Sequence, residues 1–193
     1  QNSMKKSAGK KVEIAVFISG TGSNLKNLIK FSKKKKQFKI KLVISNKNDA
    51  KGLIFANQNK INTKVYNFKK RSQDEKKILN ILLKEKIQII CLAGFMKILS
   101  KNFIKKFNGK IINIHPSLLP NYKGLNTHRR VLNNNEKYSG CSVHFVNSKL
   151  DSGKIILQKK VKILKNDTPK KLQKRILRQE HKIYPRALQM IVG

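Results

Sequence analysis

The chain has 193 residues, which suits one domain of ordinary size, and its 39% hydrophobic content can build a core, which excludes wholesale disorder. Its 45 basic and 9 acidic residues give a net charge of +36, which favours anionic partners but does not indicate a fold. No apolar stretch approaches the roughly 20 residues of a membrane span, and residues 1–11 lack the apolar segment of a signal peptide.

A regular alternation of apolar runs and helical patterns follows a basic tail, which we expect to occupy residues 1–11. Strands are predicted at 12–18, 40–45, 87–93 and 110–115. Helices are predicted at 25–36, 50–60, 72–86 and around 101–107. The segment TKVYNF follows the second of these helices. Ser72 is expected to cap the third helix. Strands that are buried on both faces and alternate with helices predict right-handed β-α-β units and a parallel sheet.

The final third of the chain has a different pattern. A long loop starting at HPSLLP is expected to end in a helix, and SGCSVHFV and KIILQKKVKIL are expected to form a strand pair joined through NSKLDSG. A long closing helix is predicted over 168–192, with Thr168 as its cap and Pro169 in its first position. The sequence therefore predicts a single α/β domain over residues 12–193, with a mostly parallel sheet flanked by helices.

The glycine-rich turn SGTGSN at 19–24 lies between the first strand and the first helix. Such a turn directs free backbone N–H groups at an anion. A dinucleotide site is disfavoured, because Leu25 stands at the third glycine position and the second strand ends in Ser45-Asn46 without a carboxylate. A single phosphate group fits this turn, and a tight turn with a Ser or Asn cap is the alternative.

Asn113 and His115 lie at the carboxyl end of a central strand, the edge where open α/β sheets bind ligands. Two residues apart on a strand, they are expected to share a face. Asp151 stands in a glycine-flanked loop among lysines, in a chain with few carboxylates. The alternatives are a structural histidine and an aspartate that stabilises its own turn.

No metal site and no activated nucleophile is predicted. The four histidines lack metal-ligand spacing and have no carboxylate cluster beside them. Cys91 lies in an apolar run, so a buried, reduced thiol is expected, as is typical of a cytoplasmic protein.

Six stretches in order over residues 12–191 resemble the phosphoribosylglycinamide formyltransferase family of purine synthesis: ISGTGSNL, ISNKNDAKGL, LAGFMKILS, INIHPSLLPNYKGLNTHR, SVHFVNSKLDSGKIILQ and QEHKIYP. Related folate enzymes that transfer or hydrolyse formyl groups share the Asn, His, SLLP and Asp pattern. They generally lack the GSN loop and the final QEHxIYP.

The resemblance implies a Rossmann-like formyltransferase fold and transfer of the formyl group of 10-formyltetrahydrofolate to the amine of 5-phosphoribosylglycinamide. It implies three groups of site residues: Asn113, His115 and Asp151 in catalysis; Gly22, Ser23 and Asn24 at the substrate phosphate, with Glu180 near the ribose; and Arg71, Met96, Lys97, Ile98, Leu99 and Asn113 around the folate. The loop around Asp151 would close over the pterin.

Three positions depart from the usual family pattern. Asn126 stands where GLHTH has a histidine, Lys97 often reads Arg, and Cys141 often reads Thr. None of these removes a catalytic group, although Asn126 alters a position on the substrate side. The chain also ends at Gly193, before the C-terminal extension of many members, which bears on the packing of the last helix.

The residue types agree with this chemistry. An Asn amide and a protonated imidazole are suitable donors for the oxyanion that forms when an amine attacks a formyl carbon, and a nearby carboxylate favours the protonated imidazole. Direct transfer is expected, with His115 relaying protons.

Two rival functions are considered. A nucleic-acid-binding protein would explain the charge, but the lysines are spread and aromatic residues are 7% with no Trp. A formyltetrahydrofolate hydrolase is the rival within enzymes. The expected partners are small molecules, without a membrane or a specific nucleic acid, and the oligomeric state stays open between a monomer and a weak dimer.

Overall fold

A computed structural model describes residues 11–193, so the predicted tail lies outside the described residues except for Lys11. The chain forms a seven-stranded sheet in the order β3-β2-β1-β4-β5-β6-β7, in which β1 to β5 are parallel and β6 and β7 are antiparallel to their neighbours. The strands are β1 Val12–Ile18, β2 Phe38–Ser45, β3 Asn62–Val65, β4 Ile89–Leu92, β5 Lys110–His115, β6 Tyr138–Phe145 and β7 Ile155–Lys162. The predicted mostly parallel sheet and C-terminal strand pair are confirmed.

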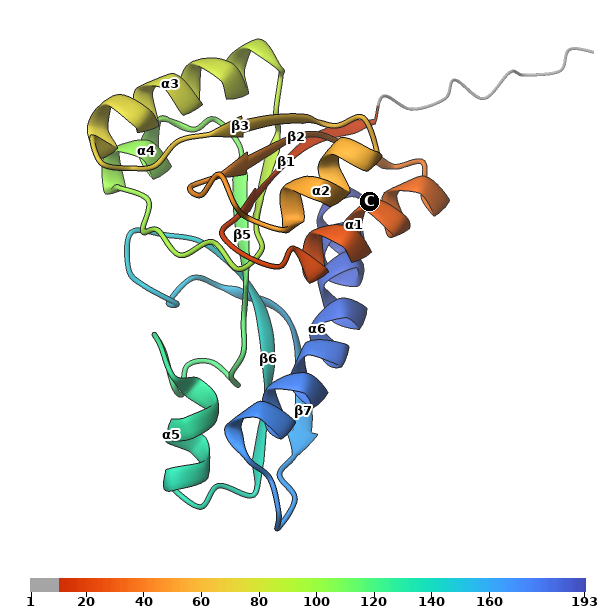
Figure 1. Cartoon of the computed structure of the whole chain (residues 1–193), viewed down its shortest axis with the longest axis vertical. Coiled ribbons are helices and arrows are strands. Elements are labelled where there is room, and N and C mark those ends of the chain that lie inside the picture. The colour runs from red at the N-terminus through yellow and green to blue at the C-terminus, as the bar shows by residue number, and fades with distance from the viewer. Residues whose placement is uncertain (1–10) are drawn as a thin grey trace, which may run out of the picture.

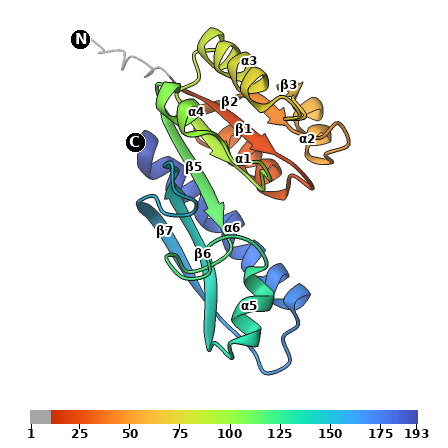
Figure 2. The same ribbon diagram turned by 90° about the vertical axis from the view of Figure 1, so that its left-hand side faces the viewer.

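Helices cover both faces of the sheet (Figures 1 and 2). The helices are α1 Ser23–Lys34, α2 Gly52–Gln58, α3 Arg71–Lys84, α4 Lys101–Lys106, α5 Thr127–Asn133 and α6 Pro169–Val192. One buried core joins the sheet to α1, α2 and α6, and a second core joins its other face to α3 and α4. Because helices cover both faces, the central strands are almost continuously apolar, as in β1 (VEIAVFI).

The long closing helix α6 is confirmed with its predicted start. The Thr168 hydroxyl accepts from the Lys171 N–H, and Pro169 occupies the first helical position. Further along α6, the fully buried Tyr184 donates its hydroxyl to the Leu92 carbonyl at 2.7 Å. This bond attaches the helix to the end of β4.

The predicted cap of α3 is wrong. Ser72 lies inside the helix, which starts at Arg71 after Lys70, and no side chain within residues 11–193 caps it. Instead, the Asp74 carboxylate reaches back and accepts from the Phe68 N–H at 2.9 Å. A first-turn carboxylate thus fixes the chain that enters the helix. The sequence spacing alone does not show whether this carboxylate or the serine hydroxyl holds the start of the helix.

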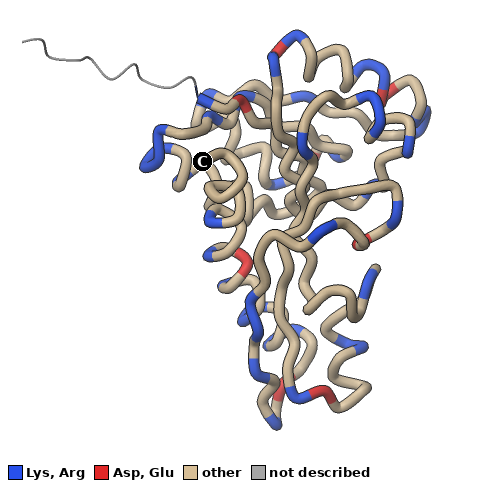
Figure 3. Tube along the Cα trace, turned by 180° about the vertical axis from the view of Figure 1, so that it is seen from behind, with Lys and Arg blue, Asp and Glu red and all other residues tan. Residues whose placement is uncertain are grey.

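The charge is spread over the whole fold. Figure 3 shows Lys and Arg along helices, strands and loops alike, with few acidic residues among them. None of the helices within residues 11–193 is long and apolar enough to cross a membrane.

The parallel order brings three loops to one edge of the sheet. The loops after β1, β4 and β5 leave the carboxyl ends of adjacent strands, because β4 lies between β1 and β5. In doubly wound sheets this edge is where ligands bind. The turn 19–24, the segment 93–99 and the Asn113–His115 pair all lie there.

Candidate active site

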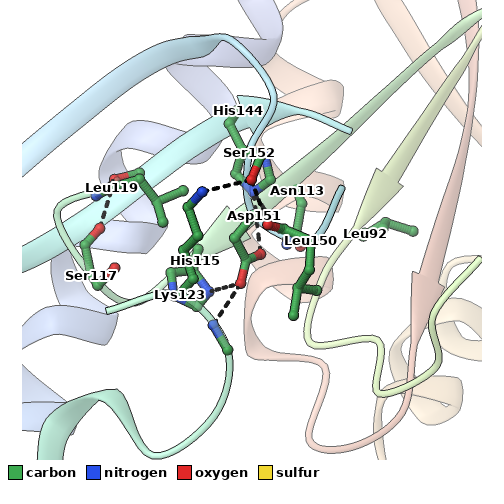
Figure 4. Close-up of polar contacts among 12 residues, drawn as sticks. Leu92, Asn113, His115, Ser117, Leu119, Lys123, His144, Leu150, Asp151 and Ser152 are labelled. Carbon is green, nitrogen blue, oxygen red and sulfur yellow. Dashed lines mark hydrogen bonds and ion pairs between the residues drawn. The ribbon is translucent and has the colours of Figure 1, made fainter. Parts of the chain in front are cut away.

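His115 and Asp151 form a buried pair at this edge. His115 Nδ1 lies 3.5 Å from Asp151 Oδ2, and the two side chains are only 7% and 6% exposed. The same carboxylate oxygen accepts from the Gly124 N–H at 2.8 Å. Figure 4 shows the Asp151 carboxylate directed at His115, with Asn113 and His144 beside it. The structure therefore brings together the three residues predicted to be catalytic.

Acceptors surround the imidazole of His115. Its Nε2 lies 2.8 Å from the Tyr122 carbonyl oxygen, which can only accept, while Nδ1 faces the Asp151 carboxylate. Both ring nitrogens of His115 therefore face acceptors of the protein, which fix the orientation of the ring.

Both partners of His115 lie on an unusual backbone. Tyr122 has φ +55° and Asp151 has φ +46°, in the left-handed region that non-glycine residues seldom adopt. Such residues cost on the order of 1–3 kcal/mol and cluster at functional sites. Here the conformation directs a carbonyl and a carboxylate at the same imidazole.

His144 completes the site, although sequence reasoning did not select it. Antiparallel pairing of β5 with β6 sets His144 opposite Asn113, and His144 Nε2 lies 3.5 Å from the Asn113 Nδ2 and 3.7 Å from Asp151 Oδ1. Burial lowers the pKa of His144, so the neutral ring is favoured, and its Nδ1–H donates to the Phe145 carbonyl at 2.9 Å. The free Nε2 then accepts from the Asn113 amide and orients it.

The loop after His115 is held by the strand pair. The Ser142 hydroxyl of β6 donates to the Ser117 carbonyl at 2.6 Å and accepts from the Leu119 N–H at 3.1 Å. Gln158 of β7 donates to the Leu119 carbonyl at 2.8 Å. These buried hydrogen bonds fix the path of the segment that carries Tyr122 and Gly124 back to the site.

In the turn before α1, the backbone lies directly against the start of α2. Gly22 has φ +71°, and a Cβ on it would lie 2.3 Å from the Gly52 Cα of α2, so both positions need glycine. The first hydrogen bond of α1 runs from the Lys26 N–H to the Gly22 carbonyl, and no side chain within residues 11–193 caps this end. The N–H groups of the first turn, which includes Ser23 and Asn24, are therefore available to an anion.

Asn24 and Glu180 meet across the fold although 156 residues separate them. The Asn24 Nδ2 donates to Glu180 Oε2 at 2.9 Å, and both side chains are buried. Burial raises the pKa of Glu180. The Asn24 Oδ1 is buried and has no hydrogen-bonding partner among residues 11–193. Polar groups predicted to contact one substrate thus form a single cluster beside the turn.

The residues predicted for the folate divide into two sets. Met96 and Ile98 are 62% and 65% exposed on the segment after β4, with Lys97 exposed between them, whereas Leu99 is 6% exposed and packs in the core under α3 and α4. Arg71 stands apart at the start of α3. It lines a cavity of about 230 Å³ together with Lys76, Ser100 and Lys106, among others.

Two positions that depart from the usual pattern have clear surroundings. Asn126 precedes α5 with φ +57°, a conformation that asparagine tolerates better than most residues. Cys141 is buried on β6, and burial raises the pKa of its thiol to about 12. Cys91 is also a free, buried thiol with a pKa of about 12, raised by burial. Neither thiol is ionised at neutral pH.

Within residues 11–193 no group of three or more His, Cys, Asp or Glu side chains is arranged to hold a metal ion. The polar side chains at the edge of the sheet are an amide, two imidazoles and one carboxylate.

The comparisons with known proteins agree with this arrangement. The family model described as formyl transferase matches residues 12–188. A phosphoribosylglycinamide formyltransferase of Haemophilus influenzae is 44% identical over 90% of this chain and 84% of its own length. The human trifunctional purine biosynthetic protein adenosine-3 is 46% identical over 95% of this chain, which spans only 19% of that longer protein.

Solved structures give the same result. The crystal structure of phosphoribosylglycinamide formyltransferase from Anaplasma phagocytophilum has a TM-score of 0.89 and 41% identity, and covers 95% of this chain and 88% of its own. A glycinamide ribonucleotide transformylase from Symbiobacterium toebii has a TM-score of 0.91 at 34% identity, and covers 95% of this chain and 89% of its own. The chain therefore belongs to the formyl transferase family, and within it to the phosphoribosylglycinamide formyltransferases.

Proposed function

We propose that the chain transfers the formyl group of 10-formyltetrahydrofolate to the amine of 5-phosphoribosylglycinamide, giving formylglycinamide ribonucleotide and tetrahydrofolate. The observation that carries this proposal is the meeting of Asn113, His115 and Asp151 at the sheet edge that also holds the phosphate-ready turn 19–24. The names of the relatives support the same reaction.

The phosphate of the acceptor substrate would bind at the first turn of α1. The N–H groups of Ser23 and Asn24 are donors there, and the helix dipole adds favourable charge. The free Asn24 Oδ1 and the Glu180 carboxylate are acceptors that suit the ribose hydroxyls. This arrangement directs the amine toward the carboxyl end of β5.

The formyl folate would lie along the segment after β4. The exposed apolar side chains of Met96 and Ile98 offer surface to its ring, and Arg71 lies beside Lys76 and Lys106, where the carboxylates of the folate tail would be attracted. The folate is a substrate in this scheme.

Transfer would proceed by direct attack. The amine nitrogen forms a bond to the formyl carbon, and the formyl oxygen gains negative charge that the Asn113 amide and the His115 imidazolium stabilise. The His115 Nδ1, whose 3.5 Å contact with Asp151 is long for a hydrogen bond, would turn toward this oxygen. Collapse breaks the bond to N10 of the folate, which takes up a proton while the attacking nitrogen loses one.

Formyl transfer and formate release distinguish this function from that of a formyltetrahydrofolate hydrolase. The chain is incubated with ¹³C-formyl folate, with and without 5-phosphoribosylglycinamide, and the label is followed by NMR. We expect the label in the amide of the product when the acceptor is present and negligible formate in its absence. Formate release that does not depend on the acceptor would favour the hydrolase.

A further inference from the structure

Three strands end at a hydrogen-bonded junction of Ser19, Asn46 and Met96, which follow β1, β2 and β4. The Ser19 hydroxyl donates to the Asn46 Oδ1 at 2.5 Å and accepts from the Met96 N–H at 2.7 Å. Ser19 and Asn46 are 3% and 7% exposed. One buried hydroxyl thus holds the backbone of the segment after β4 and is itself oriented by β2.

The segment 94–99 depends on this junction. Among the described residues, the Met96 N–H is the one backbone donor of 94–99 that finds an acceptor. The Phe95 ring packs edge-to-face on Phe17 and Phe68, and Leu99 anchors the far end in the core. Between them, Met96 and Ile98 are mostly exposed, so packing does not fix their backbone. Loss of the Ser19 hydroxyl would leave the exposed part of the segment with no hydrogen bond to the sheet.

The rest of the phosphate turn, residues 20–24, does not depend on the Ser19 side chain. The Gly20 carbonyl accepts from the Gly52 N–H at 3.0 Å, and Gly22 packs directly on Gly52. The turn therefore keeps its own anchors on α2 when the hydroxyl is removed. The junction therefore acts on the segment after β4 and not on the turn before α1.

We propose that Ser19 is a positioning residue, which holds the Met96–Ile98 backbone in place for the formyl folate while leaving the phosphate turn unaffected. The identity of this ligand rests on the proposed function. A hydroxyl with a purely structural role would stabilise the fold without this selectivity between substrates.

Ser45 offers a matched control. It pairs with Ile18, next to Ser19, at the end of β2 and is fully buried. Among residues 11–193, its hydroxyl bonds only within its own turn, with the Lys47 N–H and carbonyl. Ser19→Ala and Ser45→Ala therefore remove the same atom from adjacent strand ends. Ser19→Thr keeps the hydroxyl.

The experiment measures kcat and KM for both substrates, and amide hydrogen exchange over 94–99, in the full chain and its three variants. In Ser19→Ala we expect the KM for formyl folate to rise about fivefold, the equivalent of one neutral hydrogen bond. The KM for phosphoribosylglycinamide should change less than twofold. Amide exchange at Met96 should accelerate in Ser19→Ala. Ser19→Thr should restore the KM for formyl folate and the exchange rate at Met96, and Ser45→Ala should leave these two quantities unchanged.

Two results would overturn the inference while the proposed function stands: equal losses for both substrates in Ser19→Ala, or the same folate defect in Ser45→Ala. A wild-type chain that transfers no formyl group would overturn the proposed function instead. Hydrogen exchange needs no ligand, so unchanged exchange at Met96 in Ser19→Ala would overturn the inference in that case too.

Discussion

Replacing Asp151 by Asn should remove a charge while keeping the geometry of the site. The amide oxygen can take the place of Oδ2 and accept from the Gly124 N–H, and the amide nitrogen can take the position of Oδ1, 3.7 Å from the His144 Nε2. The folded structure should therefore survive, and a loss of activity would report the lost charge.

The expected loss follows from the separation of the charges. At 3.5 Å and an effective dielectric constant of about 20, a carboxylate and an imidazolium attract by about 5 kcal/mol before desolvation is considered. A fall in turnover of about 10² corresponds to about 2.7 kcal/mol, well within this range. We expect Asp151→Asn and His115→Ala each to lower kcat by about 10² or more.

The double variant tests whether the two residues act as one unit. If His115 needs its carboxylate, the double variant should be little worse than the poorer single variant, because residues that act together are not additive. Asp167→Asn is a control for loss of a carboxylate elsewhere, since Asp167 pairs with Arg175 away from the site, and should leave kcat unchanged.

Fully multiplicative losses of about 10⁴ in the double variant would refute this reasoning. Imidazole ¹⁵N shifts provide a second readout: Asp151→Asn should change the Nδ1 signal of His115, because Nδ1 faces the Asp151 carboxylate at 3.5 Å. An unchanged spectrum would mean that Asp151 only shapes its loop.

Three further predictions concern binding and stability. Asn24→Ala should weaken phosphoribosylglycinamide far more than folate in titration calorimetry, because Asn24 lies at the phosphate turn; equal losses would contradict the assignment. Burial raises the pKa of Glu180, so its contribution to stability is full below about pH 4.5 and is lost as pH rises through the folded pKa. Glu180→Gln should therefore have the same unfolding temperature as the wild type in acid and a higher one than the wild type above the folded pKa. A variant that is less stable than the wild type across the whole pH range would contradict this. Tyr184→Phe should cost about 1–2 kcal/mol in urea unfolding, because the Leu92 carbonyl loses its donor; an unchanged midpoint would show that the bond contributes nothing.

The elements of the fold were largely predictable from local patterns. The apolar runs at 12–18 and 110–115 are β1 and β5 without change, and the Thr168-Pro169 start of α6 was visible because capping is a local property. The start of α3 was not, because Ser72 and Asp74 are both plausible first-turn residues. Only the position of the preceding chain decides which one is used.

Site residues were predictable where their place at the end of one strand marks them. They were not predictable where their role depends on which strands or helices lie side by side. Asn113 and His115 were found because they end a central strand. His144 was missed because its role arises from the antiparallel register of β5 and β6, which sets it opposite Asn113. The Asn24–Glu180 contact likewise depends on how α6 lies against α1, which the resemblance implied but no local pattern encodes.

The most direct test of the account is a rapid-quench single turnover with labelled formyl folate bound to excess enzyme. On addition of 5-phosphoribosylglycinamide, the label should leave the folate and appear in the product at the same rate, and neither formate nor formylated protein should accumulate. Label that accumulates on the protein, or as formate before product forms, would contradict direct transfer at the site of Asn113, His115 and Asp151.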